Sequence, residues 1–398
     1  MDALSLVRRL TAFKPLLLAF IAFCAWPVVA GMVQRLVQHQ WILMDIDAVL
    51  CGARTLAGHH SPYAIHPVCK SLRPAAFVYA PQVAQLFAPF VKAFGVVMAR
   101  NLFDILILAP ASLFLLWFAL VRKLPGVDIR YRWLAFSCLT PLTLLCGNVG
   151  IVMHALILAS LLLFPKTRWP FTLAVLACAC VKPTFLAYFV IFLLDDMAPW
   201  RRLVAFGWRA ALGLAVVKLI VVTDGHYGPV WQKTLHTVAL TRQPGMGWFE
   251  LTDIVFHVPP ASLLNLELAG AFMVAMLLSG AAIAQWGGLD GDERLVLGMG
   301  LVPLMTPRIL DYDMILVIPY AALLVACAQR RGGPFVGFAV SWLFVAWLVY
   351  GIVTSMMGMR AWHRTPMDML LFGLLTAIAG LVATAHRLAG DRPESLER

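Results

Sequence analysis

The sequence contains few charged residues. Among its 398 residues, 31 are Lys or Arg and 20 are Asp or Glu, which makes 13% charged, whereas a soluble domain has about 25%. By contrast, 62% of the residues are apolar, and the mean hydropathy is +0.85. This balance excludes a soluble globular domain and a disordered chain. Since a helical span needs about 20 residues, the apolar content allows at most about twelve spans. We predict an all-α, polytopic membrane protein whose single domain covers residues 1–398.

The sequence also lacks the short motifs of nucleotide-dependent and metal-dependent enzymes. It has no Gly-rich phosphate loop, no HExxH and no zinc-ligand spacing. We therefore expect no cofactor and no metal site. The net charge of +11 would suggest nucleic acid in a soluble protein. In a membrane protein, basic residues mark cytoplasmic loops and attract anionic lipid, so we expect membrane lipid and no nucleic acid as a partner.

The N-terminal segment allows two interpretations. Arg8, Arg9 and Lys14 precede an apolar run over residues 15–33, and the small residues at 28–31 are compatible with a signal-peptide cleavage site. The run is long for a signal peptide and contains Trp-Pro, which favours a first transmembrane helix that is retained.

Twelve apolar segments follow one another along the chain. They lie at 15–33, 102–121, 133–146, 152–164, 171–179, 184–194, 203–222, 263–284, 295–306, 314–327, 334–355 and 370–385. Basic residues concentrate in the short loops of one side, which predicts that both termini are cytoplasmic. Several segments are too short to span a bilayer, so we expect short or re-entrant helices whose turns line a cavity at membrane depth. Two long external loops are expected, at 34–98, with juxtamembrane helices over 75–94, and at 223–260.

Ionisable residues at membrane depth are costly and are candidates for function. In the predicted topology they gather at the outer turns, where one outward-facing cavity can receive them: Asp45, Asp47, Asn148, Lys182, Arg308, Asp311 and Asp313. Structural interpretations remain open for each of them, namely solvated loop carboxylates, a lysine that extends to the interface and an Arg–Asp ion pair. His154 lies inside an apolar segment, where a histidine is more often a satisfied core side chain than a functional one.

Two of the eight cysteines, Cys51 and Cys69, fall in the first external loop. If this loop faces an oxidising compartment, the two are placed to form a disulfide. We predict this bridge. The other six lie in apolar segments and are expected to behave as small buried hydrophobes.

The segment from Asp45 to Gly58, followed by Ser61-Pro62-Tyr63, resembles the first-loop signature of polyprenol-phosphate-dependent glycosyltransferases of the C superfamily, specifically family 87, the alpha-mannosyltransferase-like group. Later segments are similar to further elements of the family in the same order: Phe77-Val78-Tyr79-Ala80-Pro81, Gly147-Asn148-Val149, Val181-Lys182-Pro183-Thr184 and Pro307-Arg308 through Tyr312-Asp313. The sequence departs from the family pattern in lacking a tyrosine shortly after Asp45, and in having Ala80 for a proline and Asn148 for a glutamine.

The resemblance implies an inverting glycosyltransferase at the outer face of the cytoplasmic membrane. It would transfer a sugar, with mannose expected first, from a polyprenyl monophosphate donor to a glycan or glycolipid acceptor. Asp45 is the expected general base, with Asp47 as the alternative, and Lys182 and Arg308 are expected to bind the lipid phosphate. The remaining expected substrate-binding residues are Asn148, Tyr79, Tyr63, His154, Asp311 and Asp313. Three aromatic residues of the second loop would cover the sugar or anchor at the interface: Trp231, Trp248 and Phe249.

A secondary transporter or a flippase for lipid-linked substrates is the main alternative, because twelve helices are also typical of transporters. Transporters usually have two matching halves and a site near the midplane. We see no repeat between the halves, and the polar candidates lie on one side, which favours an enzyme. Within the enzyme class, an arabinofuranosyl- or phosphoethanolamine-type transferase stays open, as does a scaffold subunit with a degenerate site.

Overall fold

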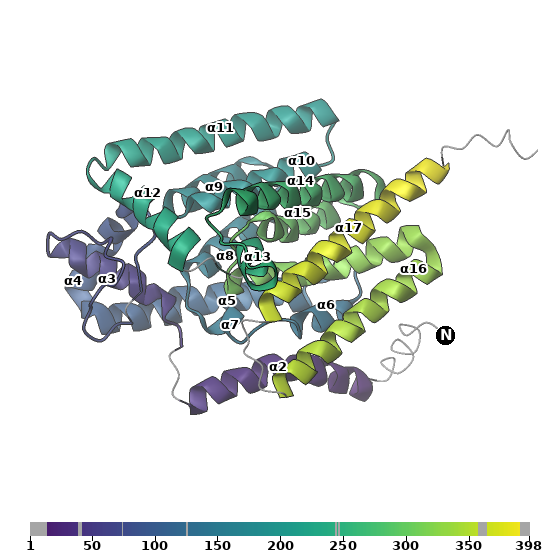
Figure 1. Cartoon of the computed structure of the whole chain (residues 1–398), viewed down its shortest axis with the longest axis horizontal. Helices are drawn as coiled ribbons and strands as arrows, with labels where there is room; N and C mark the ends of the chain where they lie inside the picture. Colours follow the sequence, from purple (N-terminus) through teal and green to yellow (C-terminus); the bar gives the residue numbers. More distant parts are fainter. Residues whose placement is uncertain are drawn as a thin grey trace, which may run out of the picture.

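The computed structural model of the chain describes residues 14–38, 42–73, 75–124, 126–242, 245, 247–356 and 364–390. Within these ranges the secondary structure is entirely helical and contains no strand. Most of the long helices run roughly along the longest axis of the molecule (Figure 1). The expectation of an all-α fold is therefore confirmed.

Among the described residues, six helical stretches are long and apolar enough to cross a membrane, as expected for a multi-pass membrane protein. They are α2 (Lys14–Val37), Pro81–Val121, α11 (Pro199–Thr223), α14 (Leu263–Trp286), Asp311–Gly333 and Asp368–Gly390. The stretch Pro81–Val121 consists of α4 (Pro81–Phe103), η1 (Asp104–Leu108), α5 (Ala109–Leu116) and η2 (Trp117–Val121). The count of twelve spans stays a prediction.

The other helical segments are shorter. They are α3 (Asp45–Ala57), α6 (Ile129–Phe136), α7 (Leu142–Leu145), α8 (Val149–Leu161), α9 (Trp169–Val181), η3 (Pro183–Val190), α10 (Ile191–Leu194), α12 (Tyr227–Thr237), η4 (Val238–Arg242), α13 (Trp248–Phe256), α15 (Gly291–Met305) and η5 (Asp311–Leu316). The chain closes with α16 (Val317–Met356) and α17 (Arg364–Gly390). The stretch Asp311–Gly333 is mostly buried, while α2 is largely exposed and lies at the periphery opposite α11 (Figure 1).

The first predicted external loop needs one correction. We expected separate juxtamembrane helices over 75–94 and a second span from 102, because Pro81 and Pro89 interrupt the segment. The structure has a helix from Pro81 up to a break at Gly95, where φ is +70° and ψ is 163°, and a second helical part after the break. Pro81 occupies the first turn, where no intrahelical donor is needed, and Pro89 does not end the helix. A separate helix therefore occupies the expected range without an interruption at Pro89, and the helical part that follows begins before residue 102. The helix α4 packs against α3.

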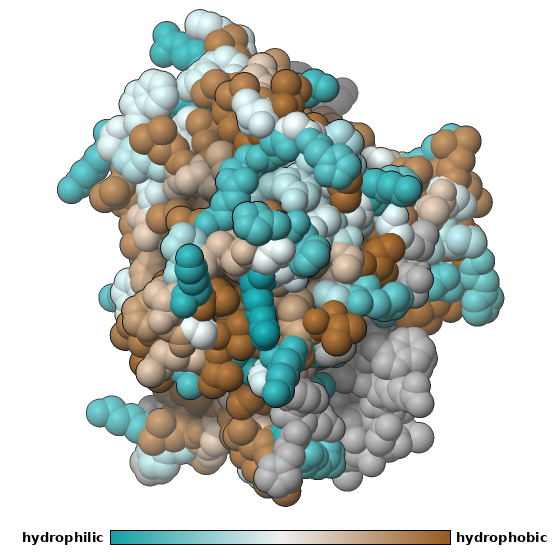
Figure 2. All heavy atoms as spheres, turned by 90° about the vertical axis from the view of Figure 1, so that its left-hand side faces the viewer, coloured by the Kyte–Doolittle hydropathy of each residue, from teal (hydrophilic) through white to brown (hydrophobic). Residues whose placement is uncertain are grey.

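The helix α3 and the first part of α4 lie at one end of the molecule, together with α12 (Figure 1). Figure 2 shows this end face on. Hydrophilic side chains gather across the middle of the face, with apolar ones among them, as expected for an end that meets water rather than lipid tails.

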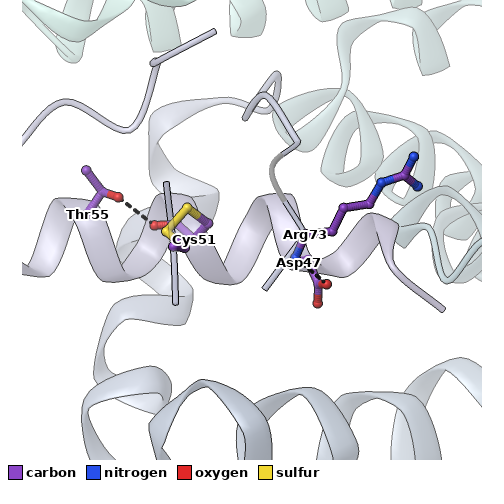
Figure 3. The surroundings of a disulfide bond; sticks show 5 residues. Asp47, Cys51, Thr55 and Arg73 are labelled. Carbon is purple, nitrogen blue, oxygen red and sulfur yellow. Dashed lines mark hydrogen bonds between the residues drawn. A yellow bond between two sulfur atoms is a disulfide. The ribbon is translucent and has the colours of Figure 1, made fainter. Parts of the chain in front are cut away.

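The predicted disulfide is present in the structure. Cys51, in α3, is bonded to Cys69 in the loop that follows, with their Cα atoms 5.8 Å apart (Figure 3). One α-helical turn before Cys51, the Asp47 carboxylate accepts a hydrogen bond from the backbone N–H of Arg73 at 3.0 Å. The bridge and this hydrogen bond attach the returning loop to α3 at two points.

We expect the Cys51→Ser/Cys69→Ser double variant to lose about 3 kcal/mol of stability, because the bridge closes a loop of 18 residues. The measurement is the melting temperature of the purified protein, with and without a reducing agent. Wild type should fall to the melting temperature of the variant on reduction, and the variant should not respond. Equal melting temperatures of oxidised wild type and variant would contradict the prediction.

Candidate functional site

Asn148 connects the start of α8 to the carboxylate of Asp45. Its Oδ1 accepts a hydrogen bond from the backbone N–H of Gly150 at 2.7 Å and so caps α8. Because Oδ1 serves as the cap, the amide nitrogen is the group left to face outward, and Nδ2 donates to Asp45 Oδ2 at 2.9 Å. The Tyr79 hydroxyl lies 3.4 Å from Oδ1. A helix cap therefore orients the carboxylate that the sequence predicted as the base.

The backbone before α3 pairs with the turn between α7 and α8. The N–H groups of Leu43 and Asp45 donate to the carbonyls of Leu145 and Cys146, at 2.7 and 2.9 Å. Gly147 completes this turn with φ of +73°. A Cβ atom on Gly147 would lie 2.4 Å from the carbonyl carbon of Leu43. Only glycine combines this backbone conformation with this close approach.

We expect Gly147→Ala to destabilise the protein by about 2 kcal/mol or more, because it adds a clash with backbone to a strained φ. The substitution should also displace Asp45 from Asn148, because it moves the backbone with which Leu43 and Asp45 pair. The matched control is Gly207→Ala in α11, where a Cβ would meet nothing within 4 Å. Thermal unfolding of both variants checks this, and similar melting temperatures would contradict it.

Asp47 has different partners from Asp45. Its side chain is fully buried, Oδ1 lies 3.6 Å from Nε of Arg100, and Oδ2 accepts from the backbone of Arg73 (Figure 3). Residues i and i+2 of a helix do not share a face. Of the two carboxylates, Asp45 is therefore the one available to a substrate.

Lys182 lies between α9 and η3 because Pro183 follows it. A residue before proline is driven out of the α conformation, and Lys182 is extended, with φ of −146° and ψ of 104°. Its Nζ donates to the Tyr312 hydroxyl at 2.5 Å and lies 5.1 Å from the centre of the Tyr312 ring. No ion pair joins Lys182 to a carboxylate in the part of the chain that the structure describes.

Asp313 is held by a chain of hydrogen bonds across three elements. Its Oδ1 lies 2.6 Å from Nε2 of His154 in α8, and the hydroxyl of Tyr188 in η3 lies 2.8 Å from Nδ1 of the same ring. Its Oδ2 accepts from the backbone N–H of Leu310 at 2.9 Å. The imidazole is therefore not a merely apolar core side chain, since both of its nitrogens are engaged.

A pocket with a volume of about 50 Å³ lies between these elements. Four predicted residues from four separate segments line it: His154, Lys182, Arg308 and Asp313. The other lining residues are Thr184, Phe185, Tyr188, Val302, Pro303 and Thr306. The pocket thus combines two basic side chains with one carboxylate and four further hydrogen-bonding side chains, those of His154, Thr184, Tyr188 and Thr306.

Asp45 lies within electrostatic range of the pocket. Burial raises the pKa of its carboxyl and outweighs the hydrogen bond from Asn148, which lowers it. Three cations also lower this pKa: Arg73, Lys182 and Arg308. The carboxyl is thus coupled to both basic residues of the pocket.

Four predicted substrate-binding residues do not line the pocket, and neither do Asp45 and Asp47. One of the four is Asn148, which caps α8 and binds Asp45. Tyr63 donates to the carbonyl of Tyr79 at 3.0 Å and so supports Tyr79 from behind. Tyr79 itself reaches Asn148 rather than the pocket. Asp311 accepts from Thr140 at 2.5 Å, on the side of α7. Each of these side chains is held by a partner on a neighbouring element, and one cavity for all of the polar candidates stays a prediction.

The aromatic residues of the second loop also differ from the expectation. Trp231 is 1% exposed, and its Nε1 donates to the carbonyl of Val78 at 3.0 Å, so it packs inside the protein and does not present a face to a sugar. Trp248 stacks on Phe272 with ring centres 4.6 Å apart, and Phe249 is buried.

The sequence analysis did not identify several residues of the site. Tyr188 is hydrogen-bonded to His154, and Tyr312 accepts a hydrogen bond from Lys182. Thr140 donates to Asp311, and Arg100 lies beside Asp47. Only Tyr312 carried a signal, since it lies inside the segment that resembles the family. In the described residues, no group of three or more His, Cys, Asp or Glu side chains is arranged to hold a metal ion.

Comparison of the chain with protein-family models, with curated proteins and with solved structures finds no match.

Proposed function

We propose that this protein is an inverting membrane glycosyltransferase. It takes a sugar, with mannose as the first candidate, from a polyprenyl monophosphate and transfers it to a hydroxyl of a glycan or glycolipid acceptor. One observation carries the proposal: Lys182 and Arg308 line a single pocket, and Asp45, oriented by Asn148, lies within their electrostatic range.

The proposed reaction uses each charged group once. Asp45 takes the proton of the acceptor hydroxyl while the hydroxyl oxygen forms a bond to C1 of the sugar. The bond between C1 and the phosphate oxygen breaks, and its electron pair stays on the lipid phosphate. Lys182 and Arg308 stabilise this developing negative charge. The lipid-linked sugar is a co-substrate, and the proposal uses no further cofactor.

The proposal includes a location. A polyprenyl donor reaches the site from the bilayer, and the end of the molecule that carries α3 and α12 faces the outside of the cytoplasmic membrane. The Cys51–Cys69 bridge supports this orientation, because disulfides persist in oxidising compartments. Both termini then lie in the cytoplasm.

The test is incubation of the purified protein with polyprenyl-phosphate-mannose and a panel of glycan and glycolipid acceptors, analysed by mass spectrometry. Transfer should release polyprenyl phosphate and add one sugar to the acceptor. A donor that stays intact with every acceptor and every polyprenyl-phosphate sugar, while vesicles containing the protein take up or flip a substrate, would replace the transferase with the transporter.

A further inference from the structure

The charges around the pocket present a problem for binding an anion. Lys182 and Arg308 are the basic residues that line it, and Asp313 lines the same pocket. A carboxylate that paired with Lys182 would cancel one of the two positive charges before any ligand arrived. A phosphate group would then have to displace it.

The structure keeps this carboxylate occupied by other donors. Asp313 Oδ1 is bonded to His154 at 2.6 Å, and Oδ2 accepts from the backbone of Leu310 at 2.9 Å. Lys182 instead donates to the Tyr312 hydroxyl. Both oxygens of Asp313 are thus engaged by groups other than Lys182, and the lysine bonds to a neutral hydroxyl.

His154 has little freedom to turn away from Asp313. Its side chain is 3% exposed, its ring centre lies 5.0 Å from that of Phe185, and Nδ1 is bonded to Tyr188. In the neutral ring, a proton on Nε2 satisfies both partners: Nε2–H donates to Asp313, and Nδ1 accepts from the Tyr188 hydroxyl. Two contacts on opposite sides of the ring therefore fix its orientation.

We propose that His154 is a positioning residue that holds the Asp313 carboxylate away from Lys182, so that Lys182 stays available to the phosphate of a ligand. This inference rests on the proposed function and extends it. It assigns His154 and Asp313 to control of the charge in the phosphate site, rather than to direct contact with the sugar.

Binding of two probes tests the proposal: inorganic phosphate, and a short-chain prenyl monophosphate in detergent, both titrated by calorimetry. His154→Ala frees Asp313 to approach Lys182, and we expect Kd to rise about tenfold. Asp313→Asn removes the competing charge and should bind at least as tightly as wild type. The double variant should match Asp313→Asn, because without the carboxylate His154 has nothing to hold. A purely structural role of His154 would leave the double variant as weak as His154→Ala.

Two further variants guard against misfolding. His154→Gln places an amide nitrogen near the position of Nε2 and should restore binding to within about threefold of wild type. Thr376→Val removes a buried hydrogen bond to Tyr320, 2.6 Å long and outside the pocket, and should leave Kd unchanged. If His154→Ala does not fold, Asp313→Asn alone decides: weaker binding than wild type overturns the proposal.

The outcomes separate this inference from the proposed function. If wild type binds neither probe, or binds them no better than Lys182→Met, the phosphate site and this inference both fail. If wild type binds, Lys182→Met does not and His154→Ala matches wild type, only the role of His154 is overturned. If the Kd values of the variants fall in the expected order with both probes, the effect of His154 is assigned to the phosphate group. If they do so with the prenyl phosphate alone, the role of His154 is supported for a lipid headgroup.

Discussion

Asp45→Asn is expected to lower the rate of sugar transfer by about 10³-fold, because it removes the general base while keeping the size of the side chain. The asparagine can still accept the hydrogen bond from Asn148, so the fold and donor binding should be preserved. The measurement is kcat for transfer from the lipid-linked donor, together with the melting temperature.

Asp47→Asn is the matched control, two residues further along α3. This substitution weakens the pairing with Arg100 and should lower stability more than activity. A fully active Asp45→Asn variant beside a folded but inactive Asp47→Asn variant would exchange the roles of the two carboxylates.

The base also predicts the pH dependence of transfer. Asp45 must be deprotonated to take a proton, and burial raises its pKa above that of a solvent-exposed aspartate. Activity should therefore be lost as pH falls through this raised pKa, at a higher pH than an exposed carboxyl would require. The acidic limb of the pH–rate profile should disappear from the residual activity of Asp45→Asn.

Lys182→Met should lower transfer by about 10²-fold, because it removes one of two charges that stabilise the leaving phosphate. Lys182→Arg should keep part of the activity, since it retains the charge but not the compact ammonium group. The exposed Lys218 of α11 provides the control, and Lys218→Met should behave as wild type. The measurement is the steady-state rate of transfer by the three variants at saturating donor. Equal losses at Lys182 and Lys218 would show that overall charge, and not this position, matters.

The sequence predicted the positions of the main site residues because local rules place them. A proline after Lys182 ends α9, and an asparagine at 148 caps α8, so both side chains lie at turns whatever else surrounds them. The two cysteines of the first external loop were likewise sufficient to predict their pairing. The helical class followed from composition alone.

The direction of each side chain could not be predicted in the same way. Whether Asp45 or Asp47 meets Asn148 depends on the pairing of the backbone at Leu43 with the turn after α7, a contact across more than a hundred residues. Trp231 was expected at the surface because it is aromatic and lies in an external loop. It is buried because the carbonyl of Val78, far away in the sequence, accepts its hydrogen bond.

The loop between the disulfide cysteines has a practical use. Tyr63 is anchored to Tyr79, and Cys69 to Cys51, while the intervening residues 64–66 are exposed. A short epitope inserted at 64–66 lies between two fixed points and need not disturb α3. Such an epitope would let an antibody report, on intact cells and on inverted vesicles, which side of the membrane this end of the protein occupies. The same rigidly anchored epitope would give a bound antibody fragment a fixed orientation, as image alignment in cryo-electron microscopy of a small membrane protein requires.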